Sequence, residues 1–175
     1  MHTFWSAGMT VLTALGAILL TVAGVAHAVR HREHRAVLRG HRLLPPSVAA
    51  PAAGAEVLVG AAMLAVLLTD PASTALPAAA QAGLYCAFAV YTAVLRTRRP
   101  GVPCGCFGAE TVSWAVVCRA VTLAAGSAGC AVLGAPGPAP DRGVCVAAGV
   151  VLAMAHHLIP AWRGAGPRKS GDAFR

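Results

Sequence analysis

Two cysteines separated by one glycine are the residues of this chain best suited to chemistry. They lie in the run Pro103-Cys104-Gly105-Cys106-Phe107-Gly108, which follows a basic segment and precedes a long apolar one. Two thiols at this spacing can close into a disulfide, bind a soft metal ion or exchange with the disulfide of another protein. The pattern therefore predicts redox or metal chemistry at the edge of an apolar region.

The residues around the two thiols favour disulfide exchange over a metal site. A bridge between residues i and i+2 needs a tight turn, which Gly105 permits, and a strained bridge is easily reduced. Pro103 and Gly108 restrict the shape of the loop that contains Phe107. No second cysteine pair or nearby histidine pair completes the four ligands of a zinc site. We therefore predict that the two thiols are a catalytic pair and that the chain holds no metal.

Two charged residues interrupt the apolar stretches. Arg119 lies thirteen positions after Cys106, and Glu56 lies within an earlier stretch. Charges at membrane depth usually face the interior of a helix bundle, where they pair or mark a functional cavity. We expect Glu56 and Arg119 to form an internal ion pair near the thiols, where the arginine would lower a thiol pKa. In the alternative, Arg119 extends outward to the membrane surface.

The composition identifies an integral membrane protein. Apolar residues make up 57% of the 175 residues and charged residues 11%, with a mean hydropathy of +0.68. This length allows several spans of ~20 residues but no separate soluble domain. The net charge of +8 does not indicate nucleic-acid binding, because aromatic residues are few and are not interleaved with the arginines.

Five apolar stretches predict an all-α bundle of transmembrane helices. We expect four core helices in a domain spanning 1–135, a fifth C-terminal helix within 136–162, and a basic cytoplasmic tail at 163–175. Helices are favoured because an open sheet would leave unpaired backbone groups in lipid. The fifth helix could instead lie flat in the interface. The stretches run from Phe4 to Val29, Val48 to Leu68, Ala78 to Leu95, Val112 to Leu133 and Val144 to Trp162.

The connections between these stretches differ sharply in charge. Arginines are concentrated after the first, third and fifth stretches, whereas the connections 69–77 and 134–143 carry Asp70, Asp141 and Arg142. Basic connections are usually cytoplasmic. We therefore predict a multi-pass protein of the bacterial inner membrane with its N-terminus outside and its C-terminus in the cytoplasm. The thiol loop would then face the cytoplasm.

The first basic connection, residues 30–46, is also rich in histidine. We interpret it as a cytoplasmic hairpin whose middle forms a short amphipathic helix on anionic lipid, rather than as a metal-binding tract. His27 lies just before it, near the end of the first stretch. We expect His27 to be a packing residue rather than a ligand.

The arrangement of these residues resembles a known family. The run from Arg98 to Gly108, followed by Trp114 and Arg119, is similar to the methylamine utilisation protein MauE family, which is itself similar to DoxX-like membrane proteins. The upstream residues that support the resemblance are Ala23 to His27, Leu43 to Pro46, Glu56 and Gly60. The similarity covers about residues 15–133, which contain four of the five stretches.

The resemblance implies a helical membrane bundle related in design to quinone-linked thiol oxidoreductases, so a quinone is the cofactor to consider. It also implies a role in maturing the disulfide-rich methylamine dehydrogenase. A thioredoxin-like, MauD-like partner would exchange disulfides with an exported substrate. The functional candidates that it carries over are Cys104 and Cys106, with Glu56 and Arg119 as supporting polar groups.

We predict a membrane thiol-disulfide redox protein in which Cys104 and Cys106 are the exchanging pair. Two alternatives stay open: a non-catalytic assembly or transport subunit, and a permease for a small solute or metal ion. One expectation conflicts with the others, because the charge pattern places the loop in the cytoplasm although disulfides of an exported protein form outside. The loop could re-enter the membrane, the protein could carry reducing equivalents outward, or the orientation could be inverted.

Overall fold

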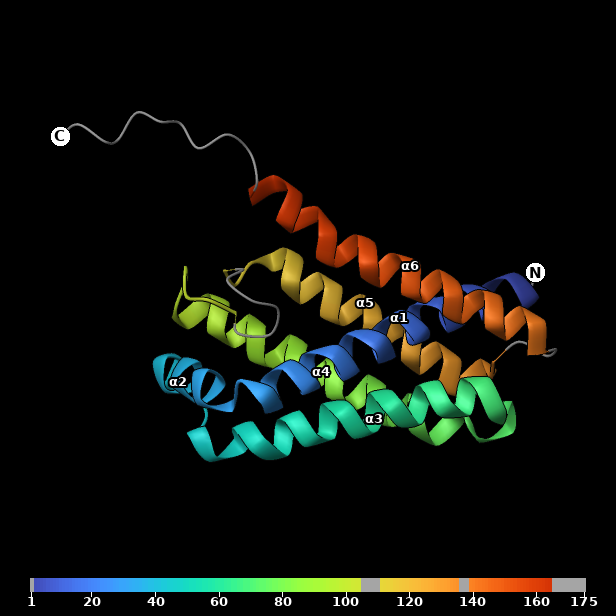
Figure 1. Ribbon diagram of the computed structural model, residues 1–175, viewed down its shortest axis with the longest axis horizontal. Helices are drawn as coiled ribbons and strands as arrows, with labels where there is room; N and C mark the ends of the chain where they lie inside the picture. The colour runs from blue at the N-terminus through green and yellow to red at the C-terminus, as the bar shows by residue number, and fades with distance from the viewer. Residues whose placement is uncertain (1, 105–110, 136–138, 165–175) are drawn as a thin grey trace.

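The described part of the protein is almost entirely helical (Figure 1). The structure is a computed structural model that describes residues 2–104, 111–135 and 139–164. Two short 3-10 turns, η1 (Pro46–Val48) and η2 (Pro71–Ser73), precede α3 and α4. The predicted all-α class is confirmed. The helices are α1 (His2–Val29), α2 (His31–His41), α3 (Ala49–Thr69), α4 (Ala75–Arg98), α5 (Trp114–Leu133) and α6 (Ala139–Gly164).

Four of these helices are long and apolar enough to cross a membrane. The qualifying segments are Phe4–Val29, Pro46–Thr69, Ala75–Arg98 and Trp114–Leu133, of 20 to 26 residues each. A helix satisfies its own backbone hydrogen bonds, which lipid cannot do. The chain is therefore a multi-pass membrane protein whose helices contact the bilayer, and the four predicted core helices are present.

The first helix, α1, lies at the centre of the bundle. It packs against α3, α5 and α6, while α4 packs mainly against α5. Small residues allow the closest approach: a Cβ added at Gly60 of α3 would lie 2.6 Å from the Ala17 carbonyl oxygen of α1. Backbones that approach this closely are typical of helix packing in lipid, where small residues line the interface.

The predicted C-terminal helix is present as α6, which lies along α1 (Figure 1). Their contact is close as well, because a Cβ added at Gly149 would lie 2.9 Å from the Leu15 nitrogen. The four helices that are long and apolar enough to cross a membrane do not include α6. The side chains of α6 are described only as far as residue 155. A fifth crossing stays a prediction.

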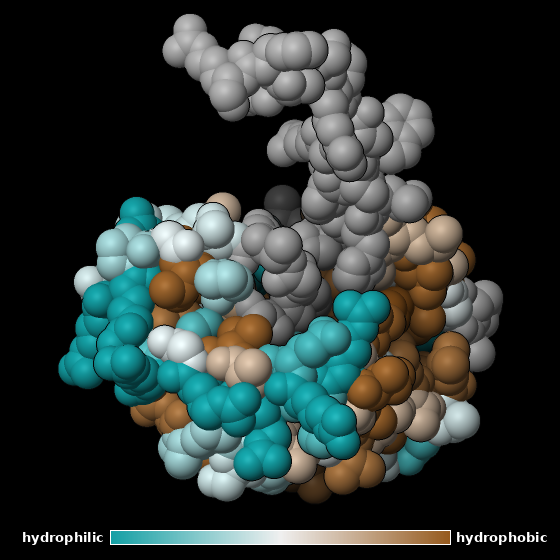
Figure 2. Space-filling view, turned by 60° about the vertical axis from the view of Figure 1, so that its left-hand side comes forward, coloured by the Kyte–Doolittle hydropathy of each residue, from teal (hydrophilic) through white to brown (hydrophobic). Residues whose placement is uncertain are grey.

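The connection after α1 forms the short amphipathic helix expected from the sequence, α2. It buries Leu38 and His41 and exposes Arg32, Arg35 and Arg39. Hydrophilic residues gather on this end of the molecule, whereas the flanks are largely apolar (Figure 2). This distribution suits a bundle whose sides face lipid and whose end faces water.

Candidate functional site

The ends of four long helices lie together at one end of the bundle. The C-terminal ends of α1 and α4 and the N-terminal ends of α3 and α5 lie there beside α2 (Figure 1). This follows from the alternating direction of successive spans. The predicted site residues Glu56, Pro103, Cys104 and Arg119 are therefore all at the same end.

Cys104 is held in a packed apolar cluster at this end. Its side chain is 3% exposed and lies among Leu95, Val112 and Val116. The base of the loop is closed by backbone contacts, since the Val112 amide donates to the Val102 carbonyl over 3.0 Å and Pro103 bridges Thr111. The backbone segments on either side of the loop, residues 102–103 and 111–112, are therefore held together by these contacts. The remaining predicted residues of the motif, Gly105, Cys106, Phe107 and Gly108, lie outside the described residues, so the pairing of the two thiols stays a prediction.

A buried histidine joins α2 to the start of the thiol loop. The His41 ring is within 2.8 Å of the Pro103 carbonyl oxygen through Nε2 and within 2.7 Å of the Tyr91 hydroxyl through Nδ1. Because a carbonyl can only accept, Nε2 carries a proton and donates it. The sequence predicts a basic hairpin on the cytoplasmic surface for this segment, but the His41 side chain is 2% exposed and lies inside the protein.

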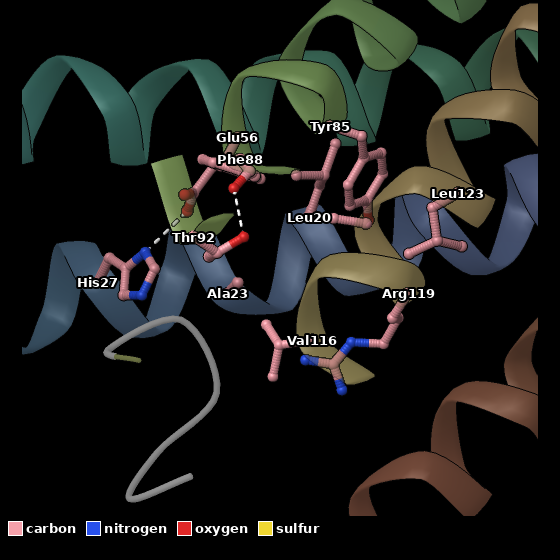
Figure 3. A pocket seen from close by; sticks show the side chains of 11 residues that line it. Leu20, Ala23, His27, Glu56, Tyr85, Phe88, Thr92, Val116, Arg119 and Leu123 are labelled. Atoms are coloured by element: carbon pink, nitrogen blue, oxygen red, sulfur yellow. Dashed lines mark hydrogen bonds and ion pairs between the residues drawn. The ribbon is translucent and has the colours of Figure 1, made fainter. Parts of the chain in front are cut away.

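A second histidine pairs with the acidic residue inside the bundle. His27 Nδ1 lies 2.8 Å from Glu56 Oε2, and both side chains are buried. They line a cavity of about 30 Å³ together with Tyr85, Thr92 and Arg119 (Figure 3). This volume is enough for about one or two water molecules.

The expected ion pair between Glu56 and Arg119 does not form between these two described residues. The Glu56 carboxylate is paired with His27 instead. Figure 3 shows the His27 ring turned toward that carboxylate, with the Arg119 side chain extending beside Val116 and apart from the pair. Arg119 is half-buried and lines the same cavity.

His34 of α2 extends this group toward the surface. Its ring stacks on His27 with centroids 4.0 Å apart and an interplanar angle of 16°. Burial, followed by the neighbouring His27 and His41, lowers the pKa of His34 from 6.5 to about 4. The ring is therefore neutral at pH 7.

The other described cysteines are dispersed over the bundle. Cys86 and Cys118 are exposed, whereas Cys130 and Cys145 are buried. Cys118 therefore points away from the cavity that its neighbour Arg119 lines. Within residues 2–104, 111–135 and 139–164, no group of three histidine, cysteine or acidic residues could hold a metal ion.

The thiol cluster and the cavity are adjacent. Val116 belongs to both, because it packs in the cluster of Cys104 and lines the cavity of Glu56 and Arg119. The Val116 side chain therefore separates the buried Cys104 thiol from the cavity that Glu56 and Arg119 line. The sequence placed these residues at one end but did not indicate the roles of His27 and His41. The sequence feature that could have indicated these roles is that a histidine lies within or close to an apolar stretch.

The comparison with known families identifies a family over most of the chain. The family described as methylamine utilisation protein MauE matches residues 5–135, which include all of α1 except its first three residues, α2 to α5 and the described residues of the candidate site. No curated protein and no solved structure matches the chain in the corresponding comparisons. The match covers well over half of the chain and confirms the resemblance seen in the motif. The chain belongs to the methylamine utilisation protein MauE family.

Proposed function

We propose that this protein is a membrane thiol-disulfide exchange protein in which Cys104 and Cys106 are the exchanging pair. In the exchange, one thiolate attacks the disulfide of a thioredoxin-like partner, which forms a mixed disulfide and releases a partner thiolate. The second thiol then attacks the mixed disulfide. In this direction the pair is oxidised to a disulfide and the partner is reduced to a dithiol. In the opposite direction a partner thiolate attacks the Cys104–Cys106 disulfide, the partner is oxidised, and the pair becomes a dithiol that passes two electrons and two protons to a quinone; this is the direction that forms disulfides in a substrate.

The observation that carries the proposal is the position of Cys104. A residue of the motif is packed against Val116, directly beside a cavity that contains Glu56, His27 and Arg119. A thiol that is 3% exposed attacks an external partner poorly, so we assign Cys104 the resolving step and Cys106 the first attack. The positive charge of Arg119 in the adjacent cavity would favour the thiolate form of Cys104 when that residue resolves the mixed disulfide.

The biological role that we propose follows from the family. Members are described as methylamine utilisation proteins, so an exported, disulfide-containing protein of that pathway, or a similar exported protein, is the proposed substrate. A MauD-like thioredoxin protein would be the direct partner, and a quinone would be the final electron acceptor. The charge pattern favours a cytoplasmic thiol loop in the inner membrane, so exchange with an exported substrate would need the loop to re-enter the membrane, the protein to carry reducing equivalents outward, or the orientation to be inverted.

The proposal is tested by maleimide gel-shift labelling of a variant that retains only Cys104 and Cys106. Intact cells and opened vesicles are labelled with and without prior reduction. We expect labelling that depends on reduction, and the side from which the pair is labelled gives its orientation. Ser47→Cys in a cysteine-free background is the control, because Ser47 is exposed in the connection at the same end of the bundle, and it should label without reduction. Thiols that stay free under every condition would overturn the proposal and leave the assembly or transport role.

A further inference from the structure

The contacts of His41 join three separate segments of the chain. His41 is the last residue of α2, Tyr91 lies on α4, and Pro103 is bonded directly to Cys104. The Nε2–H group donates to the Pro103 carbonyl, so in the neutral ring Nδ1 accepts the proton of the Tyr91 hydroxyl. Both ring nitrogens are therefore used at the base of the thiol loop.

The backbone around His41 reinforces this connection. Arg42 adopts a left-handed conformation with φ 54°, and its amide donates to the Leu38 carbonyl at the end of α2. The chain reverses there, and Leu43 packs against the cluster that contains Cys104. His41 through a hydrogen bond, and Leu43 two residues later through an apolar contact, thus both hold the start of the thiol loop.

We propose that His41 is a positioning residue for the thiol loop, which holds the carbonyl before Cys104 and keeps that thiol in its packed cluster. The redox consequence rests on the function proposed above, but the positioning does not. Removing the imidazole frees the Pro103 carbonyl and releases the start of the loop. The thiol then becomes accessible more often, because local opening becomes less costly.

The test uses a full-length variant whose single cysteine is Cys104, labelled with maleimide under reducing conditions in detergent. His41→Ala should raise the labelling rate about tenfold, as expected when a buried hydrogen bond is lost. His41→Gln should keep a slow rate, because its Nε2–H group can also donate to the carbonyl. Tyr91→Phe should give an intermediate rate, since it removes the hydroxyl that orients the ring.

Two controls separate positioning from a general loss of stability. A second series with Cys130 as the single cysteine reports on the bundle core, because Cys130 is 0% exposed and lies far along α5 from the loop. His31→Ala changes an exposed histidine of the same helix. We expect neither control to show faster labelling.

Three outcomes would overturn the inference: an unchanged Cys104 rate in His41→Ala, equal acceleration of Cys104 and Cys130, or no rescue by His41→Gln. Each of these is read from one thiol kept reduced. The exchange function is tested separately: it fails if Cys104 and Cys106 never form a disulfide in the otherwise unchanged protein. In that case the labelling rates of Cys104 in the single-cysteine variants still decide whether His41 positions the loop.

Discussion

A carboxylate inside an apolar bundle is stable only when a partner offsets its lost hydration. Glu56 is 4% exposed, and His27 supplies that partner at 2.8 Å. Removing one member of a buried pair usually costs more than removing both, since it leaves the other without compensation. The His27–Glu56 pair therefore links α1 to α3 at the end of the bundle that contains Cys104.

The first prediction concerns this pair. Glu56→Ala should lower the free energy of unfolding by about 3 kcal/mol, because it leaves His27 buried beside an empty site. The double variant His27→Ala, Glu56→Ala should lose less than the sum of the two single variants. Thermal unfolding in detergent measures the two single variants and the double variant. Glu33→Ala, which changes an exposed acidic residue of α2, is the control. Strictly additive losses would show that the two side chains do not stabilise each other.

The second prediction concerns pH and His34. Its pKa is about 4 in the folded protein and near 6.5 when unfolded, so the unfolded chain binds more protons between these values. Stability should therefore fall as the pH drops from about 6.5 toward 4 and should be fully present above 6.5. Unfolding of His34→Gln across this range should show a smaller fall than the original protein. Parallel curves would mean that His34 titrates normally.

The sequence predicted which residues share the site but not how they pair. Glu56 and Arg119 could be assigned to one end because position along a span gives depth in the membrane. The rotation of each helix about its axis decides which side chains meet, and depth does not determine it. For this reason His27 rather than Arg119 contacts Glu56.

At the scale of helices, the close contact between α1 and α3 depends on glycine. A Cβ at Gly60 would approach the Ala17 carbonyl oxygen to 2.6 Å and the Thr21 nitrogen to 3.0 Å. Both are backbone atoms, which cannot move aside as a side chain can. The two helices would have to separate, and the separation would loosen the packing along both.

The third prediction compares two glycines of α3. Gly60→Ala should lower the free energy of unfolding by about 1 to 3 kcal/mol through overpacking. Gly54→Ala is the matched control, since nothing lies within 4 Å of its added Cβ, and it should be neutral or stabilising by up to about 1 kcal/mol. Thermal unfolding in detergent distinguishes them. Equal effects of the two changes would show that α1 and α3 do not need this contact.

The helices themselves could be predicted because hydropathy and charge define them locally. The four core spans and the amphipathic α2 follow the apolar stretches and the basic connection. The burial of His41 could not be predicted, because it depends on Tyr91 and Pro103, which are 50 and 62 residues away. Contacts of that separation arise only from tertiary packing.

At the scale of the whole molecule, charge divides the bundle into two unlike ends. The end with α2 is hydrophilic and carries many exposed arginines (Figure 2). The opposite connections contain Arg142, which is 7% exposed and donates through Nε to the Leu67 carbonyl over 3.0 Å. A buried arginine that binds the end of a helix contributes little to the surface charge of its side. The charge asymmetry is therefore stronger than the sequence alone indicates.

The fourth prediction is the orientation that this asymmetry favours. Single cysteines in a cysteine-free background serve as reporters at Ser47 and Ser73, which are exposed at opposite ends, and at Ser170. An impermeant maleimide should label Ser73→Cys in intact cells, but Ser47→Cys only in opened vesicles. If α6 crosses the membrane, Ser170→Cys should behave like Ser47→Cys. Labelling of Ser170→Cys together with Ser73→Cys would mean that α6 does not cross, and labelling of Ser47→Cys in intact cells would place the thiol loop outside, where disulfides of exported proteins form.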